Sequence, residues 1–527
     1  MNKMMMTVAA AAVICGEARA ASDVDGDASD AILVAPPPAV EAVLSVDPGV
    51  AVGPIKPMNA MNSGPDFRLT SDQRAYGPTH FDAFRDLEVP MVRTHDTRYM
   101  IETPGRLNDI PLIFPDFDAD ENDPENYDFT VTDVCLNTIR MAGSRIMYFL
   151  GASAEAGVGA YGEAGWMRPP KDYAKWARVC EHVIRHYNEG WGWNNPQVAF
   201  SNQFDIAYWE IWNEPDLNCT AEYWTKGTVT WRDQHIYWNG TPEQFFEFYA
   251  TVAKHLKKTF PELRFGGPAT SGQIEWVERF LGYCRSNAVP IDFFTWHVYS
   301  AKPSVMAGYA KTYDGLLKKY GYGGAESILD EWNWNIGWSG DIGRKSIARR
   351  GDVNNYETAA FYAAAMSLMQ DTSASMLMCY DSRTGGSQYN GVFHQLTEEP
   401  LKGYYAFYAW SKLRELGTQV KGDLVTDGAL RKGEGEMYAT AARGPDGALA
   451  VLVAISTDDA NACRRVPVRL RIRGRSLAGA RCHLTDEKHL YTDTRLRPSA
   501  DGSAVIELPP NGFAVVELPS LSHIIQK

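Results

Sequence analysis

Short apolar runs alternate with amphipathic stretches between about residues 54 and 415. The apolar runs, which we interpret as strands, cover 55–60, 91–95, 145–150, 206–212, 263–267, 292–297, 327–331 and 375–380. Windows with helical periodicity lie between them, near 72–87, 131–142, 171–188, 242–258, 273–286, 303–320, 355–370 and 401–415. Such alternation is typical of parallel strands joined by crossover helices. Eight repeats predict an α/β fold, a (β/α)8 TIM barrel over residues 54–415.

The pattern changes after about Gly417, where short alternating strands such as 448–454 and 504–508 are separated by Gly, Pro and Asp turns. We interpret residues 416–527 as an accessory β-sandwich domain. Residues 21–53 are rich in Ala, Pro, Val and Asp. They predict a lead-in whose extended strands, near 40–52, are candidates to join the β-sandwich and make that domain discontinuous.

Five predicted barrel strands end in a polar residue that carries chemistry: His95, Glu214, His297, Glu331 and Tyr380. Catalytic groups of TIM barrels lie at the carboxyl ends of the strands, whereas structural residues occur anywhere along them. The spacing therefore predicts that these five side chains meet at one end of the barrel.

The two glutamates indicate glycosidase chemistry. Glu214 follows the apolar run Trp209 to Trp212 in an Asn-Glu-Pro motif, and Glu331 follows the run Ser327 to Leu329. A retaining glycosidase uses one carboxylic acid to protonate the leaving oxygen and a second carboxylate, about 5 Å away, to attack the anomeric carbon. We predict Glu214 as the general acid/base and Glu331 as the nucleophile. The alternatives are a helix-capping glutamate at 214 and a surface carboxylate at 331.

Asn213 directly precedes the predicted acid. Its amide is placed to bond the 2-hydroxyl of a sugar, an interaction that strengthens in the oxocarbenium-like transition state. The alternative is an ordinary turn residue, since asparagine is common in turns.

Composition narrows the class of partner. The net charge of −14 and the pI near 5.3 disfavour a nucleic acid or an anionic membrane surface. We expect a neutral oligosaccharide or glycoside as substrate, although one local arginine is enough to bind the carboxylate of an acidic sugar. The cysteines are scattered and form no CxxC pair, so we expect neither a metal nor a cofactor. A disulfide between Cys463 and Cys482 stays open.

The first twenty residues combine Lys3, an apolar Ala/Val/Met run and Ala18-Arg19-Ala20. This combination is typical of a cleavable secretory signal peptide. It predicts a periplasmic or secreted protein that begins near Ala21.

Four motifs carry a resemblance to a known family. They are Val92-Arg93-Thr94-His95, Glu210-Ile211-Trp212-Asn213-Glu214-Pro215, Trp296-His297-Val298-Tyr299 and Asp330-Glu331-Trp332. The chain resembles the clan A glycoside hydrolases, and most closely glycoside hydrolase family 39. The resemblance spans the predicted barrel and β domain. It implies retention of anomeric configuration by a glutamate pair, with β-xylosidases and α-L-iduronidases as the best-known activities.

The same resemblance implies supporting roles. His95 and His297 are expected to line the subsite for the non-reducing sugar, Tyr299 to donate to the nucleophile, and Arg93 to lie beneath it. Each has a structural alternative, because a lone polar residue at a strand end is often a satisfied core residue.

Three loops are candidates to choose the sugar. The segment 116–128 is rich in carboxylates, and a solvated loop is its main interpretation. The segment 334–340 offers the indole faces of Trp334 and Trp338 as a pocket wall, and 380–383 offers Tyr380 and Arg383 as a polar edge. The predicted function is a retaining, exo-acting β-xylosidase-like hydrolase. The alternatives are a uronic-acid hydrolase, a transglycosylase or another β-glycosidase on the same scaffold, and a non-catalytic carbohydrate-binding protein.

Overall fold

The fold is taken from a computed structural model of the chain. It describes residues 42–65, 80–95, 110–151, 169–193, 204–217, 237–238, 240–384, 387–426, 435–459, 462 and 464–520. The predicted signal peptide and most of the lead-in lie outside these residues. Among the helices in the described ranges, none has both the length and the hydropathy that crossing a membrane requires.

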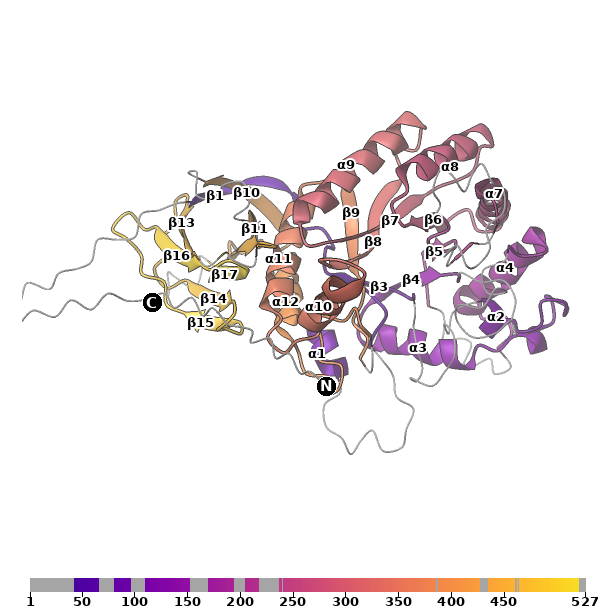
Figure 1. Cartoon of the computed structure of the whole chain (residues 1–527), viewed down its shortest axis with the longest axis horizontal. Coiled ribbons are helices and arrows are strands. Elements are labelled where there is room, and N and C mark those ends of the chain that lie inside the picture. The colour runs from indigo at the N-terminus through magenta and orange to yellow at the C-terminus, as the bar shows by residue number, and fades with distance from the viewer. Residues whose placement is uncertain are drawn as a thin grey trace, which may run out of the picture. The chain divides into compact units, whose positions relative to one another are not determined.

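Eight parallel strands close into a barrel (Figure 1). They are β2 (Ala60–Asn62), β3 (Met91–Arg93), β4 (Arg145–Phe149), β5 (Tyr208–Glu210), β6 (Arg264–Thr270), β7 (Phe293–Ser300), β8 (Glu326–Trp334) and β9 (Ala374–Cys379). Pairing of β9 with β2 closes the ring. The predicted TIM barrel is confirmed, with each strand within a few residues of its apolar run.

The crossover helices match the amphipathic windows. They are α1 (His80–Asp86), α3 (Thr130–Met141), α4 (Tyr173–Glu189), α7 (Pro242–Thr259), α8 (Ile274–Ser286), α9 (Pro303–Lys319), α11 (Tyr356–Gln370) and α12 (Lys402–Leu416). Their starts follow local rules. Thr241 and Gln244 form a reciprocal capping box at the start of α7, where Pro242 occupies the first turn.

Three short or polar elements were not predicted: α2 (Ile110–Ile113), the 3-10 helix η2 (Pro124–Asn126) and α10 (Gly340–Arg350). In α10 the only buried residues are Gly343, Ser346 and Arg350. The helix therefore has no apolar stripe from which a periodicity can be recognised.

The interior of the barrel is a packed core. One buried cluster draws a side chain from most of the strands: Ala60, Met91, Met147, Phe293, Ile328, Met376 and Met378. Apolar layers of this kind fill the barrels of TIM folds. The polar residues described below lie beyond this layer, toward the carboxyl ends of the strands.

The accessory domain is one mixed sheet of nine strands. They are β1 (Ala42–Pro54), β10 (Thr418–Thr426), β11 (Glu436–Arg443), β12 (Leu449–Ser456), β13 (Val466–Ile472), β14 (Arg481–Thr485), β15 (Thr492–Thr494), β16 (Ala504–Leu508) and β17 (Gly512–Leu518). Their order is β15-β14-β17-β12-β11-β10-β1-β13-β16. We expected a sandwich of two sheets, and the structure has a single continuous ladder. Side chains from both halves, such as Leu470 of β13 and Val516 of β17, nevertheless share one core.

The N-terminal strand β1 lies inside this sheet. It pairs antiparallel with β10 and parallel with β13. The extended stretch near 40–52 thus forms a central strand among strands from the other end of the chain.

Helices α11 and α12 pack against the sheet on strands β11 and β12 (Figure 1). Polar bonds tie the two parts together. The buried Lys402 ammonium at the start of α12 donates to the carbonyls of Asp486 and Glu487, and Gln370 of α11 donates to the carbonyl of Pro54. Cys482 is a free, buried thiol, and Cys463, the other member of the disulfide left open in the sequence, lies outside the described residues.

Candidate active site

The turn after β5 places Glu214 at the mouth of the barrel. Trp212 and Glu214 both have positive φ, 70° and 42°. This region is unfavourable for residues other than glycine, and such strain is typical of positions that the surrounding structure holds for function. Two bonds hold the turn: Glu214 N–H donates to the carbonyl of Ala269, and the Trp212 indole donates to that of Tyr237.

A β-bulge in β8 brings two neighbouring carboxylates to the same place. Trp296 pairs with Leu329 and His297 pairs with Glu331, so Asp330 is the extra residue. In a regular strand Asp330 and Glu331 would face opposite sides. A bulge re-aims side chains and is frequent beside active sites. Here both carboxylates reach the guanidinium of Arg93, with Nε to Asp330 at 3.0 Å and Nη1 to Glu331 at 3.3 Å.

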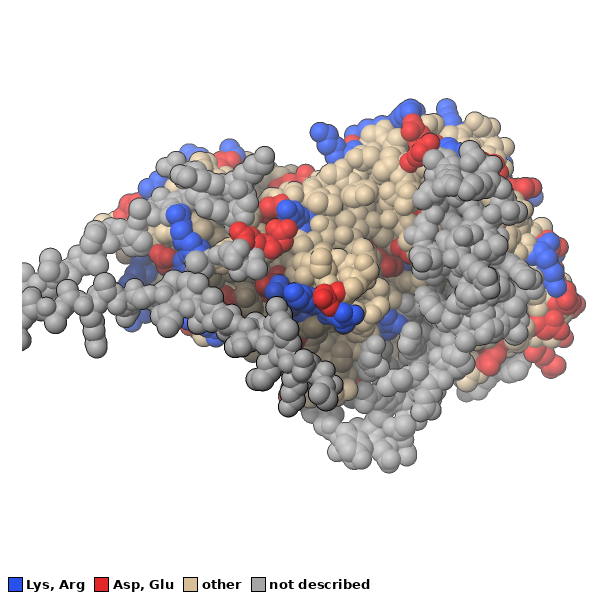
Figure 2. All heavy atoms as spheres, in the orientation of Figure 1, with Lys and Arg blue, Asp and Glu red and all other residues tan. Residues whose placement is uncertain are grey.

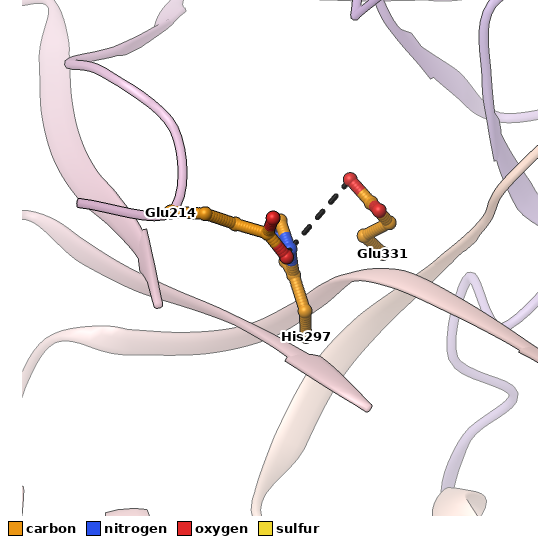
Figure 3. Close-up of side chains that lie close together, drawn as sticks. All are labelled: Glu214, His297 and Glu331. Carbon is orange, nitrogen blue, oxygen red and sulfur yellow. Dashed lines mark hydrogen bonds and ion pairs between the residues drawn. The ribbon is translucent and has the colours of Figure 1, made fainter. Parts of the chain in front are cut away.

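Glu214 and Glu331 face one another with His297 between them (Figure 3). Nδ1 of His297 lies 2.7 Å from Oε1 of Glu214 and 3.6 Å from Oε2 of Glu331. One carboxylate oxygen of each glutamate and one ring nitrogen of His297 all lie within 4.8 Å of one another. Carboxyl groups about 5–5.5 Å apart suit a retaining mechanism, whereas inverting enzymes need about 6.5–9.5 Å to admit a water molecule.

Donors surround the Glu331 carboxylate. The Tyr299 hydroxyl donates to Oε1 across 2.5 Å. On the other oxygen, Arg93 Nη1 donates across 3.3 Å and His95 Nε2 lies at 3.5 Å. A carboxylate held by donors on both oxygens has a fixed direction of attack.

Burial and neighbouring charges set the protonation of this group. Burial raises the pKa of Glu331 to about 7, and the charge of Glu214 adds to it, while His297, Arg93 and Tyr299 oppose the rise. Burial lowers the pKa of His297, but the carboxylates of Glu331 and Asp330 outweigh it and raise that pKa well above its usual value. The imidazole is therefore a cation at neutral pH, placed between two carboxyl groups.

Asn213 is fixed by Arg93 and has an amide group left to bind a ligand. Its carbonyl oxygen accepts a 2.8 Å bond from Arg93 Nη2. Its Nδ2 is buried and has no hydrogen-bond partner among the described residues. Leaving a buried amide donor unpaired costs about 1–3 kcal/mol, which a sugar hydroxyl at this position would recover.

Two buried carboxylates of the site were quoted in the sequence motifs but given no role. Glu210, the last residue of β5, and Asp330 are both fully buried, and Arg93 Nε lies 2.6 Å from Glu210 Oε2. Sequence patterns could not identify them, because Asp330 owes its direction to the bulge and Glu210 lies in an apolar run.

The remaining predicted residues lie around this centre. The ring of His95 is 5.4 Å from that of Tyr380. Arg383 is buried; its Nε donates to Asp381 across 2.6 Å and its Nη2 donates to the Tyr380 hydroxyl. Its guanidinium is therefore already paired with a carboxylate of its own loop.

The two tryptophans of the loop 334–340 differ in exposure. Trp334 is 2% exposed, whereas Trp338 is 64% exposed. The Trp338 ring packs edge to face on Tyr299, with centroids 4.9 Å apart, and lies 6.5 Å from the Tyr389 ring. Trp338 thus extends from the tyrosine that bonds Glu331.

The acidic segment 116–128 pairs with α4. Asp118 lies 2.8 Å from Lys171, just before α4, and Glu121 lies 2.7 Å from Arg178 on the helix. These ion pairs give the carboxylates of the segment a structural partner within the chain.

Comparison with known proteins gives a consistent picture. The model of "Glycosyl hydrolases family 39" matches residues 82–313. A beta-xylosidase of Caldicellulosiruptor saccharolyticus is 33% identical over 135 residues, which are 26% of this chain and 22% of that protein. A beta-xylosidase of Geobacillus stearothermophilus is 26% identical over 235 residues, 43% of this chain and 41% of that protein. The matches thus span less than half of either relative.

Solved structures match over most of the chain. A glucosidase from Croceicoccus marinus has a TM-score of 0.67 and 22% identity, covering 91% of this chain and 99% of that one. A monomeric beta-xylosidase from Caulobacter crescentus CB15 has a TM-score of 0.61 and 15% identity, covering 91% and 99%. At these identities the likeness establishes the fold, a barrel with an accessory β domain.

Proposed function

We infer that this chain, whose residues 82–313 match the model of glycoside hydrolase family 39, is a retaining glycosidase of the β-xylosidase type. The observation that carries the inference is the pair Glu214 and Glu331, whose oxygens lie within 4.8 Å at the carboxyl ends of two barrel strands. This separation fits a double displacement and leaves no room for the water of an inverting enzyme.

The proposed reaction has two steps. In the first, an oxygen of Glu331 attacks the anomeric carbon, the glycosidic bond breaks, and Glu214 transfers its proton to the leaving oxygen. In the second, Glu214 takes a proton from water as that water attacks the anomeric carbon, and the ester bond to Glu331 breaks. Glu214 is thereby reprotonated, Glu331 is again a carboxylate, and the configuration is retained.

The surrounding residues act in this scheme by position. Tyr299, Arg93 and His95 direct the Glu331 carboxylate, and the free Nδ2 of Asn213 is available to the 2-hydroxyl of the sugar. His297 contacts both glutamates. Its positive charge favours the ionised form of Glu331 in the free enzyme.

We propose that the substrate is a glycoside of a neutral sugar, and that a β-xyloside is the first candidate. Two beta-xylosidase relatives support this choice. The pairing of Arg383 with Asp381 argues against a uronic acid, since the guanidinium predicted as a carboxylate-binding edge is occupied. Charges of both signs are interspersed on the face of the molecule drawn in Figure 2.

The decisive experiment removes the nucleophile. We expect Glu331→Ala to lower turnover of 4-nitrophenyl β-xyloside by at least about three orders of magnitude. Added azide should restore release of nitrophenol and give a glycosyl azide of inverted configuration. The matched control is Glu326→Ala, a glutamate at the other end of β8 that pairs with Arg264. Undiminished turnover by Glu331→Ala would exclude the mechanism.

A substrate panel separates the other candidates. Nitrophenyl xylosides, glucosides, galactosides, arabinosides and uronides should show preference for one neutral β-glycoside, and disaccharides should reveal any glycosyl transfer to sugar acceptors. A folded protein that binds oligosaccharides but hydrolyses none of them would instead be the non-catalytic carbohydrate-binding alternative.

We also propose export, on the composition of residues 1–20. N-terminal sequencing of the protein recovered from the periplasm or the medium should begin near Ala21. Recovery of the intact N-terminus from the cytoplasm would contradict this proposal.

A further inference from the structure

Arg93 lies under three carboxylates, and only one of them has a place in the proposed reaction. Its Nε faces Glu210 at 2.6 Å and Asp330 at 3.0 Å, and its Nη1 faces Glu331 at 3.3 Å. Arg93, Glu210 and Asp330 are fully buried. Water therefore does not solvate Glu210 or Asp330, and their charges must be balanced from within the protein.

The cations around this cluster do not suffice for three charged carboxylates together with Glu214. The basic groups facing it are Arg93, His297, whose Nε2 lies 3.5 Å from Asp330, and His95, whose Nε2 lies 3.5 Å from Glu331. They supply at most three positive charges against four carboxylates. The other polar groups are neutral: Asn62 Oδ1 accepts a hydrogen bond from Arg93, and Thr295 and Tyr249 of α7 lie near Glu210. A proton held by one of the acids brings the cluster close to neutrality.

The arrangement of Glu210 and Asp330 indicates that this pair holds the extra proton of the cluster. Both carboxyl groups lie within 3.0 Å of the same nitrogen, Arg93 Nε, and each affects the pKa of the other. Two carboxyl groups so placed can hydrogen-bond to one another only when one of them is protonated. Burial and the charge of Asp330 raise the pKa of Glu210 to about 8, although Arg93 opposes the rise. Burial would raise the pKa of Asp330, but Arg93 and His297 hold it below its usual value.

We propose that Glu210 and Asp330 form a carboxyl–carboxylate pair that shares one proton and positions Arg93 between the nucleophile Glu331 and Asn213. The inference rests on the proposed function, which gives Glu331 and Asn213 their roles. Glu210 is protonated and donates to Asp330. Arg93 can then divide its N–H groups among its four acceptors, which are Glu210, Asn62, Glu331 and Asn213. Loss of that proton adds a buried negative charge that draws Arg93 toward Glu210 and away from Glu331.

The consequence is that Glu210, which does not contact substrate, sets the pH above which kcat/KM falls. We call this pH the alkaline limit. Substrates whose leaving group must be protonated also depend on Glu214 as the proton donor. A dinitrophenyl β-xyloside needs no such proton, so its alkaline limit isolates the pair. As pH rises through about 8, Glu210 loses its proton and kcat/KM for this substrate falls.

The test is Glu210→Gln, which keeps the shape and a donor to Asp330 but cannot ionise. We expect the variant to retain kcat within roughly fivefold at pH 7, and its alkaline limit on the dinitrophenyl substrate to move up by at least about one pH unit. Asp330→Asn should also move that limit, because Glu210 then ionises at lower pH against Arg93. Glu326→Gln on the same strand as Asp330 is the matched control and should leave the profile unchanged. An unchanged alkaline limit in both Glu210→Gln and Asp330→Asn would overturn the proposal.

Infrared spectroscopy measures the protonation of Glu210 directly and does not require an active enzyme. In the Glu214→Gln/Glu331→Gln double variant, the C=O stretch of a protonated carboxylic acid should disappear between pH 7 and pH 10. Addition of Glu210→Gln should abolish this change in a protein with an unaltered circular dichroism spectrum. Persistence of the band change would overturn the proposal, whereas failure of the wild type to hydrolyse any glycoside would overturn the proposed function and leave the infrared result standing.

Discussion

Tyr299 and Glu331 are joined by a 2.5 Å hydrogen bond, with the phenol as donor, between the ends of two adjacent barrel strands. Burial first, and then the charge of Glu331, raise the pKa of Tyr299 well above its usual value, so the phenol remains a donor at every working pH. This bond favours the ionised form of Glu331, whereas burial favours the protonated form.

Removal of this donor should slow the enzyme and move its acid limit. We expect Tyr299→Phe to lower kcat/KM by about 10- to 100-fold, since a hydrogen bond to a charged group contributes about 1.5–3 kcal/mol. Because the bond lowers the pKa of Glu331, its loss raises that pKa, and the rise of kcat/KM with pH should occur above about pH 7. A pH profile on the dinitrophenyl substrate measures this shift; an acid limit at the wild-type position would contradict it.

Removal of the charge of Glu214 should move the acid limit of the pH profile to lower pH. The charge of Glu214 helps raise the pKa of Glu331, so Glu214→Gln should lower it and extend activity to more acidic pH. The loss of rate should be small for dinitrophenyl substrates and large for alkyl glycosides, which need a proton on the leaving oxygen. Equal losses on both substrates would remove Glu214 from the acid role.

The exposed Trp338 is placed to stack on a sugar or aryl group bound beyond the cleaved bond. Covering about 50 Å² of its ring contributes about 1 kcal/mol, so Trp338→Ala should raise KM for a xylo-disaccharide roughly five- to tenfold with little change in kcat. Trp338→Phe should recover most of the affinity. An unchanged KM for the disaccharide would show that bound substrate does not reach this ring.

The three ligand atoms of Glu214, His297 and Glu331 resemble a site that Zn²⁺ can occupy, with one imidazole and two carboxylates. The proposed mechanism requires no metal there. Dialysis against EDTA should leave activity unchanged, and added Zn²⁺ should inhibit competitively with substrate. Activity lost with EDTA and restored by a divalent ion would assign the three residues a different chemistry.

Lys402 should contribute to stability through the contact of α12 with the β domain. Its buried ammonium donates to two backbone carbonyls, so Lys402→Met should cost about 1–3 kcal/mol of unfolding free energy. Lys412→Met on the same helix removes a surface pair with Glu415 and a contact with the Tyr408 ring, and should cost less than about 1 kcal/mol. The two urea denaturation midpoints give the comparison.

The sequence was sufficient for the barrel because eight apolar strands alternate with amphipathic helices over more than 300 residues. It also indicated the two glutamates, since each follows an apolar run. It could not indicate α10, whose surface carries no apolar stripe, nor the role of Asp330, which depends on a one-residue bulge in β8. Single-residue register cannot be recognised from periodicity alone.

In the loops, the sequence does not determine which side chains are exposed. The segment 334–340 contains two tryptophans, and nothing in the order of residues tells which indole is buried. For Arg383, the sequence does not tell whether the guanidinium is free to bind a ligand or is paired within the protein. Its partner Asp381 is two residues away, and only the three-dimensional arrangement shows that the two side chains turn toward one another.

The position of β1 has a consequence for biosynthesis. This strand leaves the ribosome before the barrel, yet both of its neighbours, β10 and β13, are translated after it. Because chains are made at about 5–20 residues per second, β1 waits on the order of half a minute for β10 while the barrel between them is produced. A nascent chain therefore carries an unpaired strand edge during most of its synthesis, and the last strands of the sheet complete a ladder that the first described residues began.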